Sequence, residues 1–186
     1  MKKQKISTKR IAMAGLLAAL TFIGSGMRIK IPVTIGGTSA FHLGNIFCAL
    51  SGILLGPGLG GAAAGLGSAL FDMTDPAYIS ECWLTFLMKG AYGMTAGLVC
   101  RNLKLGEYLR DLTATTAGAV TYAVLYLAKS FLKTVFVSGV APDAAFLALG
   151  LKVPATVFNM AVAIFIAPVL SGAIRKALEL NHITLN

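Results

Sequence analysis

Residues 42–72, HLGNIFCALSGILLGPGLGGAAAGLGSALFD, form two apolar segments that are joined by an uncharged Gly-Pro-Gly turn. The pattern predicts helices at about residues 42–55 and 58–72, each about 22 Å long at ~1.5 Å per residue. Neither helix alone spans a hydrocarbon core of ~30 Å. Small residues three and four positions apart let helix backbones approach closely, and here they are Gly61, Gly65 and Ser68. We therefore expect a tightly packed helical hairpin inside a larger bundle.

The whole chain shares this apolar character. Of its 186 residues, 56% are hydrophobic and 12% are charged, and the mean hydropathy is +0.79. A water-soluble fold of this size could not bury so much apolar surface, so we predict an all-α integral membrane protein with a single domain over residues 1–186. The alternating outer lid loop at residues 28–41 is expected to be a short hairpin or an extended strap. The six expected transmembrane helices lie at about residues 10–27, 42–55, 58–72, 82–100, 112–136 and 148–173.

The net charge of +9 is unevenly distributed. Ten of the sixteen Lys and Arg residues fall in three clusters, which are separated by even numbers of expected helices. Because cytoplasmic loops of membrane proteins carry an excess of Lys and Arg, we place these clusters and both termini in the cytoplasm, and we expect no nucleic-acid partner. The clusters are Lys2, Lys3, Lys5, Lys9 and Arg10; Arg101, Lys104 and Arg110; and Arg175 and Lys176.

The sequence lacks the patterns that common catalytic and metal sites require. Its three cysteines have no paired spacing, and His42 has no second ligand residue at metal-binding spacing. There is no glycine-rich phosphate loop that ends in Lys-Ser or Lys-Thr, no nucleophile elbow and no pair of carboxylates within an expected helix. We therefore expect a protein that is not an enzyme, that carries neither a metal nor a cofactor, and that relies on another subunit for energy.

The other six basic residues belong to the outer loops or to the outer parts of helices. An ionisable group inside a bilayer costs about 2.5–3.5 kcal/mol on insertion scales, so it normally faces a cavity or a partner. Residues three or four apart share a helix face, and each of the last three expected helices has a polar face with a lysine. Together these faces predict a substrate pocket in the outer half of the bundle. They comprise Thr85, Lys89 and Tyr92; Tyr122, Tyr126, Lys129 and Lys133; and Lys152, Thr156 and Asn159.

Each candidate residue also has a structural alternative. Lys89 is the deepest lysine, about 12 Å along its helix, whereas the lysines nearer the outer ends can extend to the headgroups. Trp83 suits either an aromatic belt at the membrane surface or stacking on a ligand. The tyrosines and Asn159 suit hydrogen bonds between helices as well as ligand contacts. His42 and Asn45, which are close in sequence, suit either a helix cap or the pocket.

The expected helix 10–27 carries small residues on one face. Ala14 and Ala18, followed by Thr21 and Ser25 at spacings of three and four, form a smooth stripe. This stripe predicts a docking surface for a partner subunit at Ala14 and Ala18. Internal packing against neighbouring helices is the alternative.

These features together resemble the S components of energy-coupling factor (ECF) vitamin transporters. The resemblance extends over nearly the whole chain and is strongest from Ala14 to Asp72. It rests on the basic amino end that leads into Ala14 and Ala18, on residues 42–45 (HLGN) and 54–57 (LLGP), and on the pattern GGxxxGxGSALxD over residues 60–72.

The resemblance implies a six-helix, multi-pass protein of the bacterial plasma membrane that captures a water-soluble vitamin with high affinity. In that family, an alanine motif on the first helix, matched here by Ala14 and Ala18, docks on a transmembrane coupling protein that carries two ABC-type ATPases. Family ligands are held largely by the last three helices and by the loops after the first and third helices. The implied partners are therefore the vitamin, the coupling protein, the two ATPases and the lipid bilayer.

The substrate is less narrowly defined by the sequence. The middle section is most similar to S components assigned to pyridoxine or to the pyrimidine precursor of thiamin, whose flat rings suit stacking on aromatic side chains. The lysine excess equally suits an anionic or larger vitamin such as folate or pantothenate. A self-sufficient carrier and a scaffold for other membrane proteins are the alternatives outside this family. The predicted binding residues are Lys89, Tyr92, Thr85, Trp83, Tyr122, Tyr126, Lys129, Thr156, Asn159, His42 and Asn45.

Overall fold

The structure, a computed structural model, describes residues 7–33 and 37–184, and over these residues the chain is predominantly helical. A short 3-10 segment, η1, precedes α4, and a π-helical turn, η2, continues α5. The elements in chain order are α1 (Thr8–Gly26), β1 (Arg28–Val33), β2 (Gly37–His42), α2 (Gly44–Leu55), α3 (Pro57–Met73), η1 (Ile79–Glu81), α4 (Cys82–Asn102), α5 (Glu107–Leu132), η2 (Lys133–Val137) and α6 (Pro142–Leu180).

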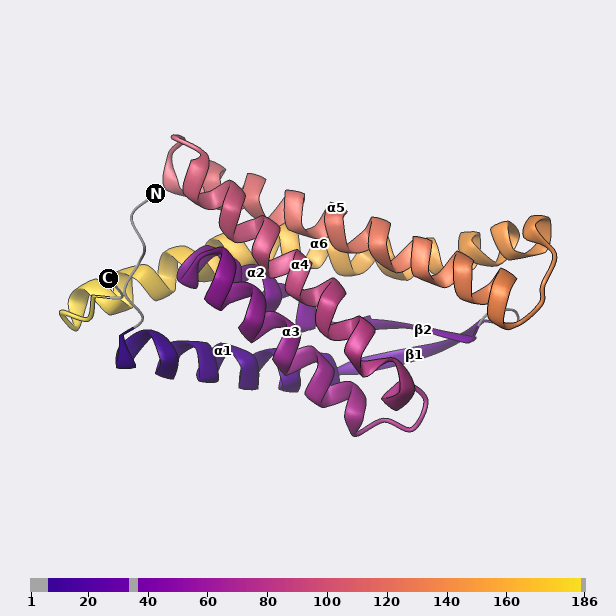
Figure 1. The fold of residues 1–186 in the computed structure, drawn as a ribbon. Coiled ribbons are helices and arrows are strands. Elements are labelled where there is room, and N and C mark those ends of the chain that lie inside the picture. Colours follow the sequence, from indigo (N-terminus) through magenta and orange to yellow (C-terminus); the bar gives the residue numbers. More distant parts are fainter. Residues whose placement is uncertain (1–6, 34–36, 185–186) are drawn as a thin grey trace.

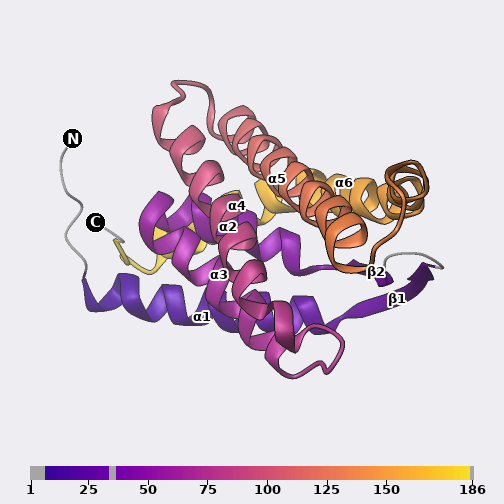
Figure 2. The same ribbon diagram turned by 45° about the vertical axis from the view of Figure 1, so that its right-hand side comes forward.

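The helices lie side by side, and the connections between them gather at the two ends of the bundle (Figure 1). The beginning of α1 and the end of α6 lie at one end, and the β1–β2 hairpin points toward the other. In a second view, α1 and α5 lie on opposite sides of the bundle (Figure 2). The central element is α2, which contacts each of the other α-helices. This position explains why a helix of 12 residues is apolar on nearly all sides.

Glycines let α2, α3 and α4 approach one another closely. A Cβ atom added at Gly52 would lie 2.2 Å from the carbonyl oxygen of Gly93, and one added at Gly60 would lie 2.2 Å from that of Ser51. Side chains cannot come so close to backbone, so both positions require glycine. The turn between α2 and α3 requires glycine for another reason, because Gly56 has a φ of 80°. The two helices therefore form the tight hairpin that residues 42–72 predict.

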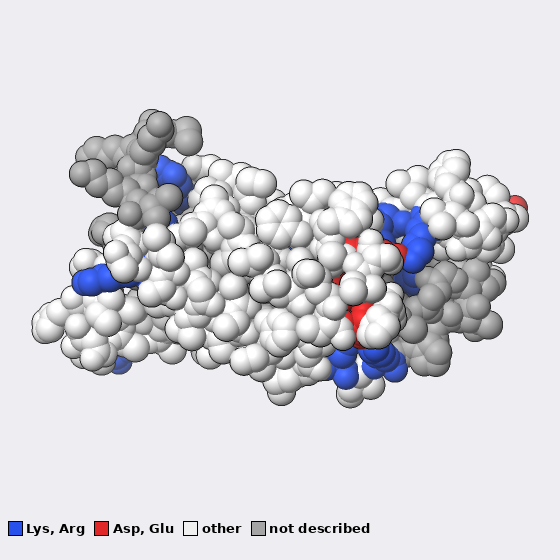
Figure 3. All heavy atoms as spheres, turned by 60° about the horizontal axis from the view of Figure 1, so that its bottom comes forward, with Lys and Arg blue, Asp and Glu red and all other residues white. Residues whose placement is uncertain are grey.

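The outward faces of the bundle are apolar. Large side chains such as Val124, Phe165 and Val169 are exposed. Two helical segments, Glu107–Val137 and Pro142–Leu180, are long and apolar enough to cross a bilayer. On the face drawn in Figure 3, the charged side chains of the described residues gather toward the ends and leave the middle uncharged. These features are typical of helices in contact with lipid, while the number of six spans stays a prediction.

The hairpin departs from the predicted all-α fold. β1 and β2 are antiparallel, and Arg28 pairs with His42 and Lys30 with Ala40. The sequence left open either a short hairpin or an extended strap, and the structure contains the hairpin. Pairing of the two strands gives hydrogen-bond partners to backbone N–H and C=O groups that a single extended strap would leave unpaired. A second difference is that α6 begins at Pro142 rather than near residue 148. Proline suits the first turn of a helix, because its missing N–H has no partner there in any case.

Candidate functional site

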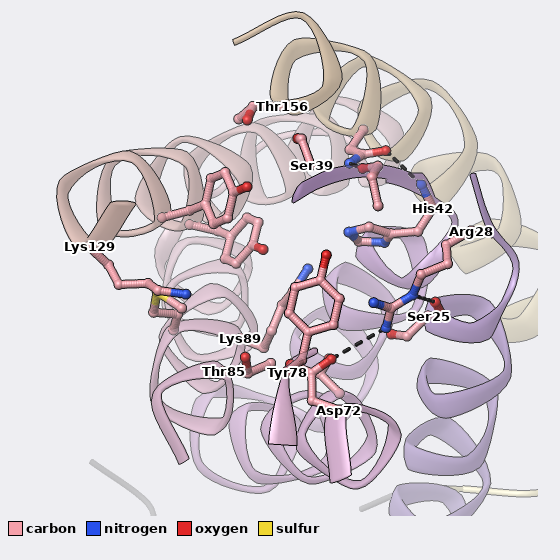
Figure 4. A pocket seen from close by; sticks show the side chains of 16 residues that line it. Ser25, Arg28, Ser39, His42, Asp72, Tyr78, Thr85, Lys89, Lys129 and Thr156 are labelled. Carbon is pink, nitrogen blue, oxygen red and sulfur yellow. Dashed lines mark hydrogen bonds and ion pairs between the residues drawn. The ribbon is translucent and has the colours of Figure 1, made fainter. Parts of the chain in front are cut away.

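A partly open cavity lies toward the hairpin end of the bundle (Figure 4). Its volume is about 90 Å³. Side chains from α1, the hairpin and the helices α3 to α6 form its walls, so the polar faces of the last three helices meet here. The predicted residues that line it are His42, Thr85, Lys89, Tyr122, Tyr126, Lys129, Thr156 and Asn159.

Lys89 lies deep in this cavity, on α4. The residue is only 3% exposed, and its Nζ donates a hydrogen bond to Oδ1 of Asn45 on α2. The same Nζ lies 3.8 Å from the centre of the Tyr122 ring, which is a cation–π contact. Figure 4 shows the amine pointing toward the middle of the cavity. The amine is thus held in one place and faces the space that a ligand would occupy.

Three tyrosines form a stack along one wall. The rings of Tyr92 and Tyr122 are 6.2 Å apart with 26° between their planes, and those of Tyr122 and Tyr126 are 5.9 Å apart with 23° between them. Tyr122 and Tyr126 line the cavity, whereas Tyr92 is fully buried behind them. Gly118 makes room for the stack, because a Cβ atom there would lie 2.5 Å from the Tyr92 ring. The wall offers flat faces on which an aromatic ligand can stack.

Three buried side-chain atoms in or beside the cavity have no hydrogen-bond partner among the described residues. They are Nδ1 of His42, Nδ2 of Asn45 and the hydroxyl oxygen of Tyr92. Buried polar groups normally have a partner, because an unpaired group costs about 1–3 kcal/mol. His42 is the one of these three residues that lines the cavity, whereas Asn45 and Tyr92 lie behind the lining.

Asn159 holds the hairpin against α6. Its Oδ1 accepts a hydrogen bond of 2.9 Å from the backbone N–H of His42, and its Nδ2 donates one of 2.8 Å to the carbonyl oxygen of Ala40. The side-chain amide thereby pairs with β2 much as a neighbouring strand would. Because β2 engages both ends of the amide, Asn159 positions the hairpin and also lines the cavity.

The other strand of the hairpin is held by ion pairs that the sequence does not predict. Nη2 of Arg28 lies 3.3 Å from Oδ1 of Asp72, and Nζ of Lys30 lies 2.7 Å from Oδ2 of Asp75. The hydrogen bond from Lys30 lowers the pKa of Asp75 below its usual value. The Arg28 guanidinium also lies 4.1 Å from the centre of the Phe71 ring. The sequence shows basic residues in one outer loop and acidic residues in another, which could have indicated ion pairs. Which of these charges pair depends on the tertiary structure.

Glu81 joins η1 to the end of α5 through ion pairs with Lys129 and Lys133. Burial raises the pKa of Glu81, but the hydrogen bonds from these two lysines outweigh burial and lower the pKa below its ordinary value. Lys152 is buried and donates a hydrogen bond of 2.5 Å to Oγ of Ser130. The outer lysines of α5 thus bind a carboxylate within the protein rather than extending to the headgroups.

We expect the link through Glu81 to weaken in acid. A carboxyl group whose pKa is lower in the folded than in the unfolded state stabilises the fold fully above its unfolded pKa of about 4.3, and this contribution is lost as pH falls through the folded pKa. The partly exposed lysines limit the effect to about 0–1 kcal/mol. Wild type and Glu81→Gln should therefore differ in thermal stability in detergent near pH 7, and the difference should shrink as pH falls below the unfolded pKa of about 4.3. A difference that does not change with pH would contradict this assignment.

Four predicted residues do not lie where they were expected. Trp83 is 60% exposed and does not line the cavity, which agrees with the membrane-surface alternative. Asn45 and Tyr92 lie behind the lining. Ala18 is buried, because α1 packs this face against α3, where a Cβ atom at Gly67 would lie 2.2 Å from the Ala18 carbonyl oxygen.

The predicted docking stripe on α1 is mostly turned inward. Ala14 is partly buried and packs against the hydrophobic core, together with the buried Ala18. Thr21 and Ser25 continue the stripe and are buried as well. Packing within the bundle thus accounts for Ala18, Thr21 and Ser25, whereas Ala14 keeps part of its surface exposed.

Comparison with known families identifies the chain. A family model described as "ECF-type riboflavin transporter, S component" matches residues 5–176. The chain belongs to this family. The resemblance to ECF S components that the sequence predicts is thus confirmed. This S component is also similar to a Pyrococcus woesei protein described as "Uncharacterized protein in gap 3'region", with 31% identity over 113 residues, which cover 61% of the S component and 72% of the relative.

Membership defines the class of function. S components are membrane proteins that bind a substrate for a transporter, so the chain is a transporter subunit rather than an enzyme. The two long apolar helices agree with a location in the membrane. The cavity among α4, α5, α6 and the hairpin is the candidate substrate site of this S component.

Proposed function

We propose that this S component captures a flat heteroaromatic vitamin, or a precursor of one, outside the cell and delivers it to an ATP-driven ECF complex. One observation carries the proposal: a polar cavity combines the stacked rings of Tyr122 and Tyr126 with the fixed amine of Lys89. Flat rings provide stacking area for a ligand ring, and a few fixed polar groups orient it.

Riboflavin is the first candidate substrate, because the name of the matching family contains it. Pyridoxine and the thiamin pyrimidine are smaller candidates with the same flat-ring chemistry. The cavity volume of about 90 Å³ is below the range of ~300–1,000 Å³ that is usual for small-molecule sites. We propose that part of the lining moves outward when the vitamin binds. Folate and pantothenate are the anionic alternatives.

We place the protein in the plasma membrane as a multi-pass protein with its basic end in the cytoplasm. The start of α1, the end of α4 and the end of α6 lie at one end of the bundle (Figure 1), and basic residues accompany all three. Such an excess of Lys and Arg is typical of the cytoplasmic side. In this orientation the hairpin and the cavity face the outside, where the vitamin is captured.

Delivery requires a surface that a transmembrane coupling protein can approach. With Ala18 turned inward, the exposed face of α1 contains Ala12, Gly15 and Ala19. A Cβ atom placed at Gly15 would meet no other atom within 4 Å. We propose this face, in place of Ala14 and Ala18, as the docking surface, because small residues allow close helix contact in membranes. ATP hydrolysis is assigned to two separate ABC-type ATPases.

Calorimetry on the purified protein tests the proposal. The protein should bind one molecule of riboflavin, pyridoxine or thiamin pyrimidine in the absence of ATP. Tyr122→Ala should weaken this binding about tenfold or more through lost stacking and buried area, whereas Tyr108→Ala, which alters an exposed tyrosine, should not. Binding of folate or pantothenate alone would favour the anionic alternative. Uptake into vesicles by this chain without partners or ATP would favour a self-sufficient carrier.

A further inference from the structure

We propose that the vitamin presents a ring edge with full or partial negative charge to Lys89, which acts as the cation that recognises this edge. Such an edge bears a ring carbonyl, an ionised ring hydroxyl or a carboxylate. The inference rests on the proposed function and narrows its substrate class. It also sets the orientation of the ligand, with the acceptor edge deep in the cavity and the ring against the tyrosine wall.

The balance of charge around the cavity is the first observation. Three cationic residues line it, and two of them have carboxylate partners, because Arg28 pairs with Asp72 and Lys129 pairs with Glu81. Lys89 has no carboxylate within 4 Å among the described residues. Its contacts are the neutral amide of Asn45 and the Tyr122 ring. A buried cation normally has an anionic partner, because taking an ion out of water costs several kcal/mol.

The donors beside Lys89 are the second observation. Nδ2 of Asn45 carries two N–H groups and has no partner, while Oδ1 of the same amide is used by Lys89. An ammonium group has three N–H donors, and Asn45 accepts one of them. Lys89 lines the cavity and has N–H donors to spare, while the unpaired Asn45 amide lies behind the lining. A ligand edge with an acceptor would pair with the amine of Lys89, whereas an edge of C–H groups would leave it unpaired.

The burial of Lys89 argues against a purely structural role. A structural lysine normally covers apolar surface with its stem and extends its amine to water or to a carboxylate. Among the described residues, the amine of Lys89 has no carboxylate within 4 Å, and it faces the cavity while the residue is only 3% exposed. An apolar side chain of similar length would suit a ligand-free fold at least as well. A ligand that accepts a hydrogen bond therefore explains the positive charge of Lys89 better than the fold does.

Two measurements on the same variants test the inference. The affinities of the protein for riboflavin and pyridoxine are determined by calorimetry, and the Tm of the ligand-free protein is determined in detergent. Lys89→Met should weaken binding about 10- to 100-fold, because a charge-assisted hydrogen bond is lost, and should leave the Tm unchanged or higher. Lys89→Arg, which keeps the charge, should weaken binding less.

Asn45→Asp is a sharper variant, because it changes charge with almost no change in size. It places a carboxylate beside Lys89 and should weaken binding about tenfold by competing with the ligand. Arg10→Met is the matched control. It removes another buried cation, which donates a hydrogen bond to the carbonyl oxygen of Leu55 and lies outside the cavity lining. This control should lower the Tm and leave the affinity unchanged.

The outcomes separate this inference from the proposed function. Undiminished binding of riboflavin or pyridoxine by Lys89→Met would overturn the inference and leave the proposed function standing. A lower Tm in Lys89→Met with unchanged affinity in the folded fraction would assign Lys89 to the fold and also overturn it. Failure of the wild type to bind any flat heteroaromatic vitamin would overturn the proposed function, and the inference with it.

Discussion

Gly15→Trp should lower ATP-driven vitamin uptake at least about tenfold while vitamin affinity stays unchanged, because overpacking of a close helix interface costs about 1–3 kcal/mol and each ~1.4 kcal/mol is tenfold. Gly15 lies on the exposed face of α1 and has space around it, so the larger side chain leaves the fold intact. Uptake is measured in vesicles that contain the coupling protein and the ATPases, and affinity is measured on the isolated chain.

Two control variants locate the effect. Val124→Trp places the same side chain at an exposed position on α5, on the opposite side of the bundle, and should leave uptake unchanged. Ala18→Trp places a tryptophan at a buried position and should reduce the yield of folded protein. Normal uptake by Gly15→Trp, or loss of uptake in Val124→Trp as well, would contradict docking through this face of α1.

Asp111→Leu should lower the free energy of unfolding by about 3–5 kcal/mol, the effect of removing one partner from a buried ion pair. Asp111 is 1% exposed at the beginning of α5. Its Oδ2 and Oδ1 lie 2.5 Å and 3.0 Å from the two terminal nitrogens of Arg175, and Oδ2 accepts a hydrogen bond of 2.6 Å from Ser171. One carboxylate therefore joins α5 to the end of α6, and its loss leaves the Arg175 charge without this partner.

Glu107→Leu is the matched control for Asp111→Leu. Glu107 lies one turn earlier on the same helix, is largely exposed, and forms a longer ion pair of 3.9 Å with Arg110. Exposed ion pairs contribute about 0–1 kcal/mol, so this variant should have little effect. Denaturation in mixed detergent micelles compares the two variants. Equal losses of stability in the two variants would show that the buried ion pair of Asp111 with Arg175 stabilises the fold no more than the exposed pair of Glu107 does.

Local pattern predicted much of the fold. Residues 42–72 predict a glycine-rich helical hairpin, and the structure contains it because the same small residues that make the pattern allow the close contacts of α2, α3 and α4. The polar faces of the last three expected helices likewise meet at one cavity. A helix period of 3.6 residues fixes which side chains share a face, so such predictions need no knowledge of the neighbouring helices.

The ligand-facing role of single residues was harder to predict. Trp83 and Tyr122 are both aromatic and both near polar residues, yet one is at the surface and the other lines the cavity. Asn159 lies on the predicted face, but β2 occupies its amide. These outcomes depend on how far each helix is rotated and on what a distant segment places against it, which the sequence of a single helix does not specify.

The sequence by itself determined that the chain is an apolar helical bundle, that it resembles an ECF S component, and that its last three helices carry polar faces with lysines. Only the tertiary structure decided that Ala18 faces inward, that Asn159 anchors the hairpin, and that Lys89 alone among the lining cations lacks a carboxylate among the described residues. The physical reason is that composition and helical period belong to one segment of the chain, whereas a contact between two side chains depends on how two segments are placed. Small residues allow close packing on whichever side a neighbour lies, and a charge is paired or unpaired only once another segment has been brought within reach.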